Sequence, residues 1–255
     1  MWSVVSLVLR IGAVAWAALV GLGAALIAAG LINPLPKFEG TVWVISLIIL
    51  GVDNVGTLIV RGSRRRRGRR MDRLEDALMV ALLQIVRETP QLHLEDLGAN
   101  AYVVSGRDSK RLHRVARLRP GRYPQESGVA WGSGKGMVGA CLDQKKRVYR
   151  NWYAVAKKYG NTDISPEAFE KIPVNTRCGF TYEEFVSIVG KYSEVLAEPI
   201  WDLRNDGRIL GVLTVDRAYR SGESEYTPLL DKRATHESAG LAASVVSRIV
   251  RPKAS

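Results

Sequence analysis

The chain opens with two long apolar runs, at about residues 11–32 and 41–60. A helix of about twenty residues is about 30 Å long, which matches the hydrocarbon thickness of a bilayer. Each run therefore predicts a membrane-spanning helix, and the short linker with its prolines and glycine predicts that residues 1–62 form a helical hairpin. A secretory signal peptide is the alternative for the first run. A second apolar run follows so closely that the hairpin is favoured.

An arginine-rich segment follows the second run, with seven arginines between Arg61 and Arg70. Basic flanks of a membrane helix stay on the cytoplasmic side. We therefore expect a multi-pass protein of the cell (inner) membrane, with both termini and all residues after Arg70 in the cytoplasm. The lipid bilayer is the expected partner, and residues 61–70 are expected to contact anionic headgroups.

Two polar residues, Asp53 and Asn54, interrupt the second run near its cytoplasmic end. An ionisable group at that depth costs on the order of 3 kcal/mol, so it should face protein or water. Ala17, Gly21 and Ala25 form a small-residue stripe on the first run, which allows helices to approach closely. The stripe fits packing within the hairpin or self-association, and a homo-oligomer is expected.

After residue 70 the pattern becomes that of a globular domain, expected over residues 71–255. Leu74, Leu78, Leu82 and Ile85 recur at helical spacing, which predicts an amphipathic helix over about 72–88. Its apolar face could form a dimer or dock on the domain, and the spacing fits both.

Short strands and turns follow this helix. Strands are predicted at 99–105, 112–118, 194–204 and 209–217, the last two joined by a turn that contains Asp206-Gly207. Thr227, followed by a proline, predicts the start of a final helix. The residues expected on one apolar face of that helix are Leu230, Ala234, Leu241, Val245 and Ile249.

A glycine-rich turn at 131–139, Trp-Gly-Ser-Gly-Lys-Gly-Met-Val-Gly, leads into a predicted short helix. A phosphate-binding P-loop needs a glycine separated by four residues from its Gly-Lys pair, and a serine or threonine after that pair. Val129 and Gly136 occupy these positions. The turn is therefore not expected to hold a phosphate.

The order of these elements resembles that of GAF domains. The resemblance rests on the glycine-rich turn before a short helix and on Ala197-Glu198-Pro199-Ile200, followed by the stretch 207–216 that reads Gly-Arg-Ile-Leu-Gly-Val-Leu-Thr-Val-Asp. It covers about residues 72–250. It implies an α+β fold in which helices flank a central antiparallel sheet, with the first and last helices packed together.

The stretch 151–193 departs from the usual GAF pattern and carries its own helix starts, at Ser165-Pro166 and at a capping box beginning at Thr181. In GAF domains this region covers the ligand pocket. The resemblance thus implies a ligand-binding wall, for which ordinary core packing is the alternative. Its candidate residues are Trp152, Tyr153, Arg177, Cys178, Phe180 and Tyr182.

Charge and cysteine content narrow the chemistry. The formal net charge is +12, but residues 1–70 hold nine basic and two acidic side chains, so much of the excess lies beside the predicted membrane helix. Nucleic acid is therefore not an expected partner. Two cysteines, Cys141 and Cys178, and three scattered histidines offer no zinc-type spacing, so no metal site is predicted. Whether either thiol is redox-active is open at this point.

These observations favour a membrane-anchored GAF-type sensor that binds a small molecule and signals through its membrane helices or a partner protein. A nucleotide is one candidate ligand, and no cofactor is identified. The alternative is a nucleotide-activated effector that oligomerises and disrupts the membrane, as in antiphage defence. A sulfoxide reductase, as in another GAF branch, is a third class. Without an evident catalytic set, we expect a protein that is not an enzyme.

Overall fold

The chain divides into two compact units, Met1–Arg69 and Arg70–Ser255. The computed structural model describes Ala25, Ala29, Gly30 and residues 68–105, 110–121, 123–204, 207–222 and 226–251. Both predicted membrane spans, Asp53, Asn54 and most of the arginine-rich segment lie outside these residues. Within the described part of the chain, no helix combines the length and the apolar character that crossing a membrane requires.

The second unit is built on a five-stranded antiparallel sheet with the order β2-β1-β5-β4-β3. The strands are β1 (Leu97–Ser105), β2 (Arg111–Leu118), β3 (Val148–Asn151), β4 (Tyr192–Trp201) and β5 (Ile209–Ala218), preceded by a 3-10 turn, η1 (Leu94–Asp96). The four longer strands confirm the sequence prediction, and β3 is an addition to it. Strand β5 lies at the centre of the sheet.

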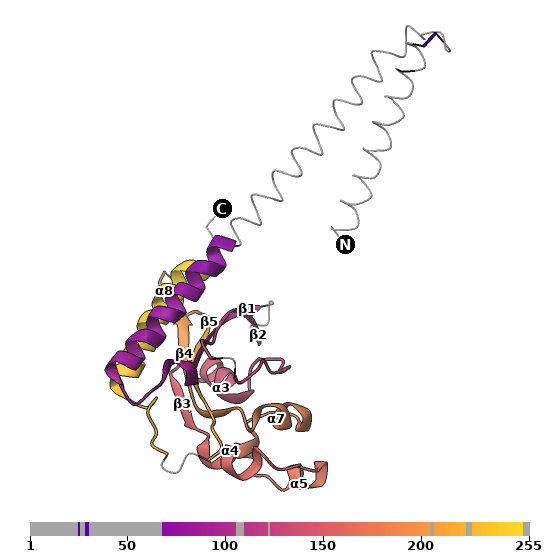
Figure 1. Ribbon diagram of the computed structural model, residues 1–255, viewed down its shortest axis with the longest axis vertical. Helices are drawn as coiled ribbons and strands as arrows, with labels where there is room; N and C mark the ends of the chain where they lie inside the picture. Colours follow the sequence, from indigo (N-terminus) through magenta and orange to yellow (C-terminus); the bar gives the residue numbers. More distant parts are fainter. Residues whose placement is uncertain are drawn as a thin grey trace. The chain divides into compact units, whose positions relative to one another are not determined.

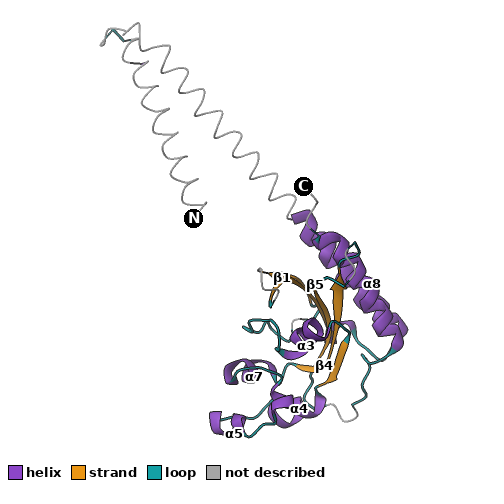
Figure 2. Ribbon diagram, turned by 180° about the vertical axis from the view of Figure 1, so that it is seen from behind, coloured by secondary structure: helices purple, strands orange, loops and turns teal. Residues whose placement is uncertain are grey.

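One face of the sheet is covered by two long helices that lie side by side, helix 68–88 and α8 (Arg233–Val250) (Figures 1 and 2). Leu78, Leu82 and Ile85 of the first helix are fully buried in the same core as Leu213 of β5. The amphipathic face of helix 68–88 therefore docks on its own domain, which was one of the two open interpretations. The first and last helices of the unit pack together on an antiparallel sheet. This is the GAF-like arrangement that the sequence implied.

The opposite face carries a set of shorter helices. These are α3 (Gly136–Gln144), α4 (Tyr153–Tyr159), α5 (Pro166–Glu170), α6 (Val174–Arg177) and α7 (Tyr182–Ile188). Ser165 caps α5, and Thr181 forms a capping box with Glu184 at the start of α7, as the sequence predicted. Phe185 of α7 is fully buried and packs on Phe169 at 5.5 Å between ring centroids.

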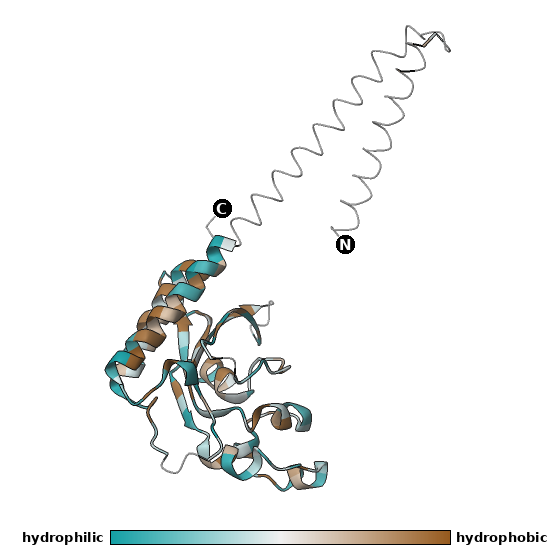
Figure 3. Cartoon of the chain, in the orientation of Figure 1, coloured by the Kyte–Doolittle hydropathy of each residue, from teal (hydrophilic) through white to brown (hydrophobic). Residues whose placement is uncertain are grey.

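Two predictions about the final helix are wrong. It begins at Arg233 and not near Thr227, and the segment before it is bound to Glu194 of β4 through two backbone N–H groups. Its buried face also differs, since Leu241 and Val245 are 60% and 46% exposed. The face that contacts the core is lined instead by small or polar residues and valines: Thr235, Ser238, Ala239, Ala242, Ala243, Val246, Ser247 and Val250. Small side chains let α8 approach helix 68–88 closely, and Figure 3 shows the apolar residues along both helices.

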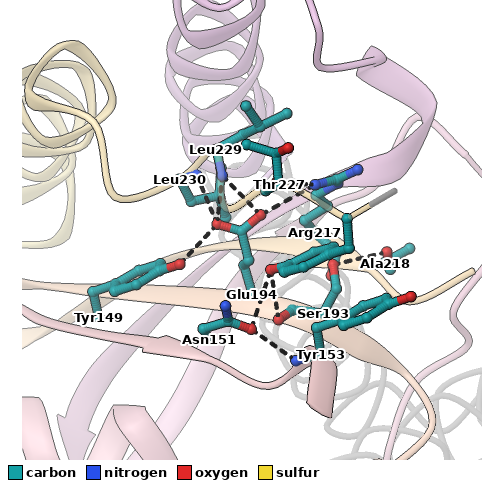
Figure 4. Close-up of polar contacts among 11 residues, drawn as sticks. Tyr149, Asn151, Tyr153, Ser193, Glu194, Arg217, Ala218, Thr227, Leu229 and Leu230 are labelled. Atoms are coloured by element: carbon teal, nitrogen blue, oxygen red, sulfur yellow. Dashed lines mark hydrogen bonds and ion pairs between the residues drawn. The ribbon is translucent and has the colours of Figure 1, made fainter. Parts of the chain in front are cut away.

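The displaced helix start is explained by Glu194 of β4, whose side chain is fully buried. Its carboxylate accepts hydrogen bonds from Leu230 N at 2.7 Å and from Leu229 N at 2.9 Å (Figure 4). Tyr149 Oη donates to the same carboxylate at 2.9 Å, and Arg217 Nη1 lies 3.3 Å from it. These bonds hold residues 229 and 230 against β4, residue 230 forms a bend, and α8 begins three residues later.

Candidate functional site

A cavity of about 40 Å³ lies between the sheet and the shorter helices. Side chains from β1, β4 and β5 form its floor, while α3, α7 and the segments before them form its cover. Its lining is mostly apolar and aromatic, with a polar group at one end, and consists of Asn100, Tyr102, Trp131, Gly136, Met137, Val138, Trp152, Phe180, Ile188, Tyr192, Val195, Thr214 and Asp216. Small-molecule sites typically have this composition.

Four rings form consecutive walls of the cavity. Tyr102 and Trp131 are 5.8 Å apart with planes at 60°, and Trp131 and Phe180 are 6.0 Å apart at 80°. Trp152 then meets Phe180 at 6.5 Å and 50°. Because neighbouring rings are strongly tilted, they enclose a box and not a flat slot. The shape suits a compact ligand better than a planar ring system.

The polar end is built by the pairing register of β1 and β5. Asn100 lies opposite Thr214, and alternation along β5 puts Asp216 on the same face. The Asn100 amide donates to Thr214 Oγ1 at 3.3 Å and to Asp216 Oδ2 at 3.2 Å. Arg119 forms an ion pair with the other carboxylate oxygen, Oδ1. The three lining residues thus form one connected, buried polar group.

The glycine-rich turn holds the cover of the cavity in place. Gly136 N donates to the Cys178 carbonyl at 2.8 Å, and Gly134 N donates to Asp143 Oδ2 at 2.8 Å. A Cβ on Gly136 would lie 2.7 Å from Phe180 Cζ, so only glycine lets this ring close the cavity. The N–H groups of Gly134 and Gly136 are therefore engaged within the protein.

Two of the six predicted wall residues line the cavity: Trp152 and Phe180. Tyr153 lies at the start of α4 and stacks on Tyr226 with centroids 3.9 Å apart and planes at 3°. That stack fastens the loop before α8 to the cover segment, so Tyr153 contributes to packing at a different place.

The other three predicted wall residues lie in the cover but outside the lining. Arg177 pairs with Glu170 at 2.9 Å. Cys178 is half-buried, and its Sγ lies 2.7 Å from Arg150 Nη1. Tyr182 donates its hydroxyl to a main-chain carbonyl before α5 at 2.7 Å. Their contacts are those of structural residues that hold the cover together.

Sequence reasoning placed Asn100, Tyr102, Thr214 and Asp216 in strands but did not select them as site residues. A usable signal was present, because polar residues in the interior strands of a sheet must find buried partners. Among the described residues, no cluster of His, Cys, Asp and Glu could hold a metal ion.

No protein-family model and no curated protein match the chain. Solved structures similar to it include type II free methionine-R-sulfoxide reductase from Thermoplasma acidophilum, with 9% identity, a TM-score of 0.43, and coverage of 72% of this chain and 94% of that one. The GAF domain of an Acinetobacter phosphoenolpyruvate-protein phosphotransferase is 16% identical, with a TM-score of 0.38 and coverage of 73% and 91%. The corresponding GAF domain from Coxiella burnetii is 12% identical, with a TM-score of 0.34 and coverage of 69% and 94%. With such low identities and TM-scores, these similarities assign no function to this chain. The arrangement of its own sheet and helices is GAF-like.

Proposed function

We propose that the GAF-like domain is a regulatory module that binds a small molecule in the cavity between sheet and cover. The observation that carries this proposal is the cavity with tilted aromatic walls and a hydrogen-bonding group at one end. Such a site presents a largely apolar surface and few polar groups at fixed positions, which is how proteins select small ligands.

We further propose that the cavity binds its ligand without transforming it. Among the described residues that line it there is no cysteine, histidine or lysine, and the carboxylate of Asp216 is already paired with Asn100 and Arg119. Cys141 lies nearby in the core, but burial raises the pKa of its thiol to about 12. This supports a binding protein over a sulfoxide reductase.

The third part of the proposal concerns location. The two apolar runs and the seven arginines up to Arg70 support anchoring to the cell membrane by a helical hairpin, with the GAF-like domain in the cytoplasm. Occupancy of the cavity would then be transmitted to the membrane helices or to a partner protein. Nucleotide activation of a membrane effector gains no support from the cavity, because about 40 Å³ is room for a few water molecules and a nucleotide has many more heavy atoms.

Ligand binding can be tested on the purified full chain by thermal shift with a panel of small amides, alcohols, amines and carboxylates. We expect at least one class to raise the unfolding temperature, because a ligand that binds only the folded state stabilises it. The control is Val138→Phe, which fills the cavity from α3, where Val138 is 3% exposed. Circular dichroism must show that this variant is folded.

The proposal fails if no compound shifts the transition of the wild type. It also fails if the shifts persist in folded Val138→Phe, because the compounds would then bind elsewhere.

A further inference from the structure

Asp216 is the one charged side chain among the described residues that line the cavity. Its charge is balanced by Arg119, which lies outside the lining and pairs with Oδ1. The two side chains are only 4% and 3% exposed. Burial lowers the pKa of the Arg119 guanidinium to about 10, which leaves it charged at neutral pH. The Asp216–Arg119 ion pair at the polar end is therefore neutral as a unit.

This ion pair depends on a specific place in the sheet. Gly98 of β1 lies opposite Asp216 in the pairing register. A Cβ at position 98 would lie 2.2 Å from Arg119 Nη2. The missing side chain is thus what lets the guanidinium reach the carboxylate. Arg119 also lies over the ring of Tyr192, at 5.7 Å from the centroid, which holds it against the cavity wall from outside.

Charge balance decides which ligands the cavity can accept. A buried anion would face the Asp216 carboxylate and the negative faces of the aromatic rings, with no cation in the lining. A buried cation would be attracted to the ring faces but would find the carboxylate already neutralised by Arg119, and an incompletely compensated buried charge is costly. An uncharged ligand avoids both penalties.

Hydrogen-bonding capacity adds a second requirement. An ionised carboxylate offers about four acceptor sites. Asp216 uses one oxygen for Asn100 and the other for Arg119, so acceptor capacity remains on both. The Thr214 hydroxyl accepts from Asn100 and can donate its own proton. The end of the cavity thus favours a ligand with an N–H or O–H group.

We propose that the cavity selects a compact uncharged molecule of a few heavy atoms, with a donor group at its polar end, and that Arg119 sets this charge preference. The inference rests on the proposed function and adds the ligand class and the residue that determines it. The cavity volume of about 40 Å³ has room for a few water molecules, since one water needs about 10–15 Å³ of cavity volume.

Acetamide, acetate and acetamidinium provide a test, because they share one shape and differ in charge. Each is titrated against the full chain by saturation-transfer NMR, with affinities on the order of millimolar expected for so few atoms. The wild type should bind acetamide at least tenfold more tightly than either ion. The signal should disappear in Val138→Phe.

Two variants test the role assigned to Arg119. Arg119→Met removes the balancing charge, and Gly98→Ala keeps the arginine but blocks its path to Asp216. Both should shift the preference toward acetamidinium, by tenfold or more relative to acetamide. A merely structural role for Arg119 would weaken all three probes alike.

The outcomes separate this inference from the proposed function. Suppose that acetate or acetamidinium binds to the wild type as tightly as acetamide does, and loses that binding in Val138→Phe. This result would overturn the charge preference and leave ligand binding in the cavity intact. If the order of the three affinities is unchanged in folded Arg119→Met and Gly98→Ala, Arg119 is not the cause of the charge preference. Failure of acetamide to bind would overturn the ligand class, while the wider panel decides the proposed function independently.

Discussion

Glu194 is the buried charge on which the junction between β4 and the segment before α8 depends. Its carboxylate receives main-chain N–H groups from Leu229 and Leu230, the hydroxyl of Tyr149 and the guanidinium of Arg217 (Figure 4). Glu194→Gln preserves the shape of the side chain and one acceptor oxygen. The new amide NH₂ would face at least one donor that loses its partner, and the guanidinium would lose a counter-charge.

The expected cost follows from those losses. A buried donor without a partner costs about 1–3 kcal/mol, and breaking one side of a buried ion pair costs about 3–5 kcal/mol. The two losses share the same group and do not add, so we expect Glu194→Gln to lower the free energy of unfolding by about 3–5 kcal/mol. This is a large part of the roughly 5–15 kcal/mol that stabilises a typical domain.

Urea unfolding of fragment 70–255, followed by tryptophan fluorescence, measures this change. The matched control is Glu237→Gln, which also breaks a carboxylate–arginine pair but on the surface of α8, where the side chains of Arg233 and Glu237 are 92% and 60% exposed. That pair should contribute under about 0.5 kcal/mol. If Glu194→Gln costs no more than about 1 kcal/mol, the carboxylate is not the acceptor that holds this junction.

Three further predictions concern the same unit. Fragment 70–255 should fold alone, because it contains its own hydrophobic cores. Leu213→Asp should unfold this fragment, because it places a charge at a position that is 1% exposed, and circular dichroism would show the loss of structure. Iodoacetamide should modify native Cys141 much more slowly than a free thiol, since its side chain is fully buried and burial raises its pKa to about 12. Half-buried Cys178, whose pKa burial also raises, should react faster than Cys141 but more slowly than a free thiol. Mass spectrometry of both sites would contradict this if Cys141 labelled as fast as the unfolded chain. Val80 and Leu241 are 63% and 60% exposed and line one groove between helix 68–88 and α8. If the expected homo-oligomer forms at this groove, sedimentation should show the wild type as a larger species and the Val80→Glu/Leu241→Glu double variant as a monomer.

Local sequence signals predicted the regular elements well. The capping box at Thr181 and the serine cap at Ser165 act within one helical turn, so the sequence alone specifies them. The four longer strands were visible through apolar and β-branched residues between turn signals. Strand β3 was not, because Val148–Asn151 is short and only partly buried, and its pairing with β4 supplies what its own residues do not indicate.

Tertiary contacts overrode the local signals at the final helix. Thr227 and the proline after it are good helix-start residues, but the N–H groups of Leu229 and Leu230 bind Glu194, 35 residues or more away in sequence. The apolar face was misassigned for a related reason. Leu241 and Val245 are the larger apolar residues, yet alanines face the core because the neighbouring helix already fills that space with leucines. Residue size alone does not reveal which side of a helix has room.

The polar end of the cavity marks the limit of sequence reasoning more clearly. Asn100 and Asp216 lie on the two interior strands β1 and β5, where both edges of each strand are paired and side chains alternate between two covered faces. A buried polar residue at such a place is informative, because water cannot satisfy it. The sequence therefore indicates that these residues need partners. It does not indicate that Arg119, beyond the end of β2, reaches Asp216 through the space left by Gly98. Because that long-range contact fixes the charge of the cavity, the class of ligand follows from the folded structure and not from any motif.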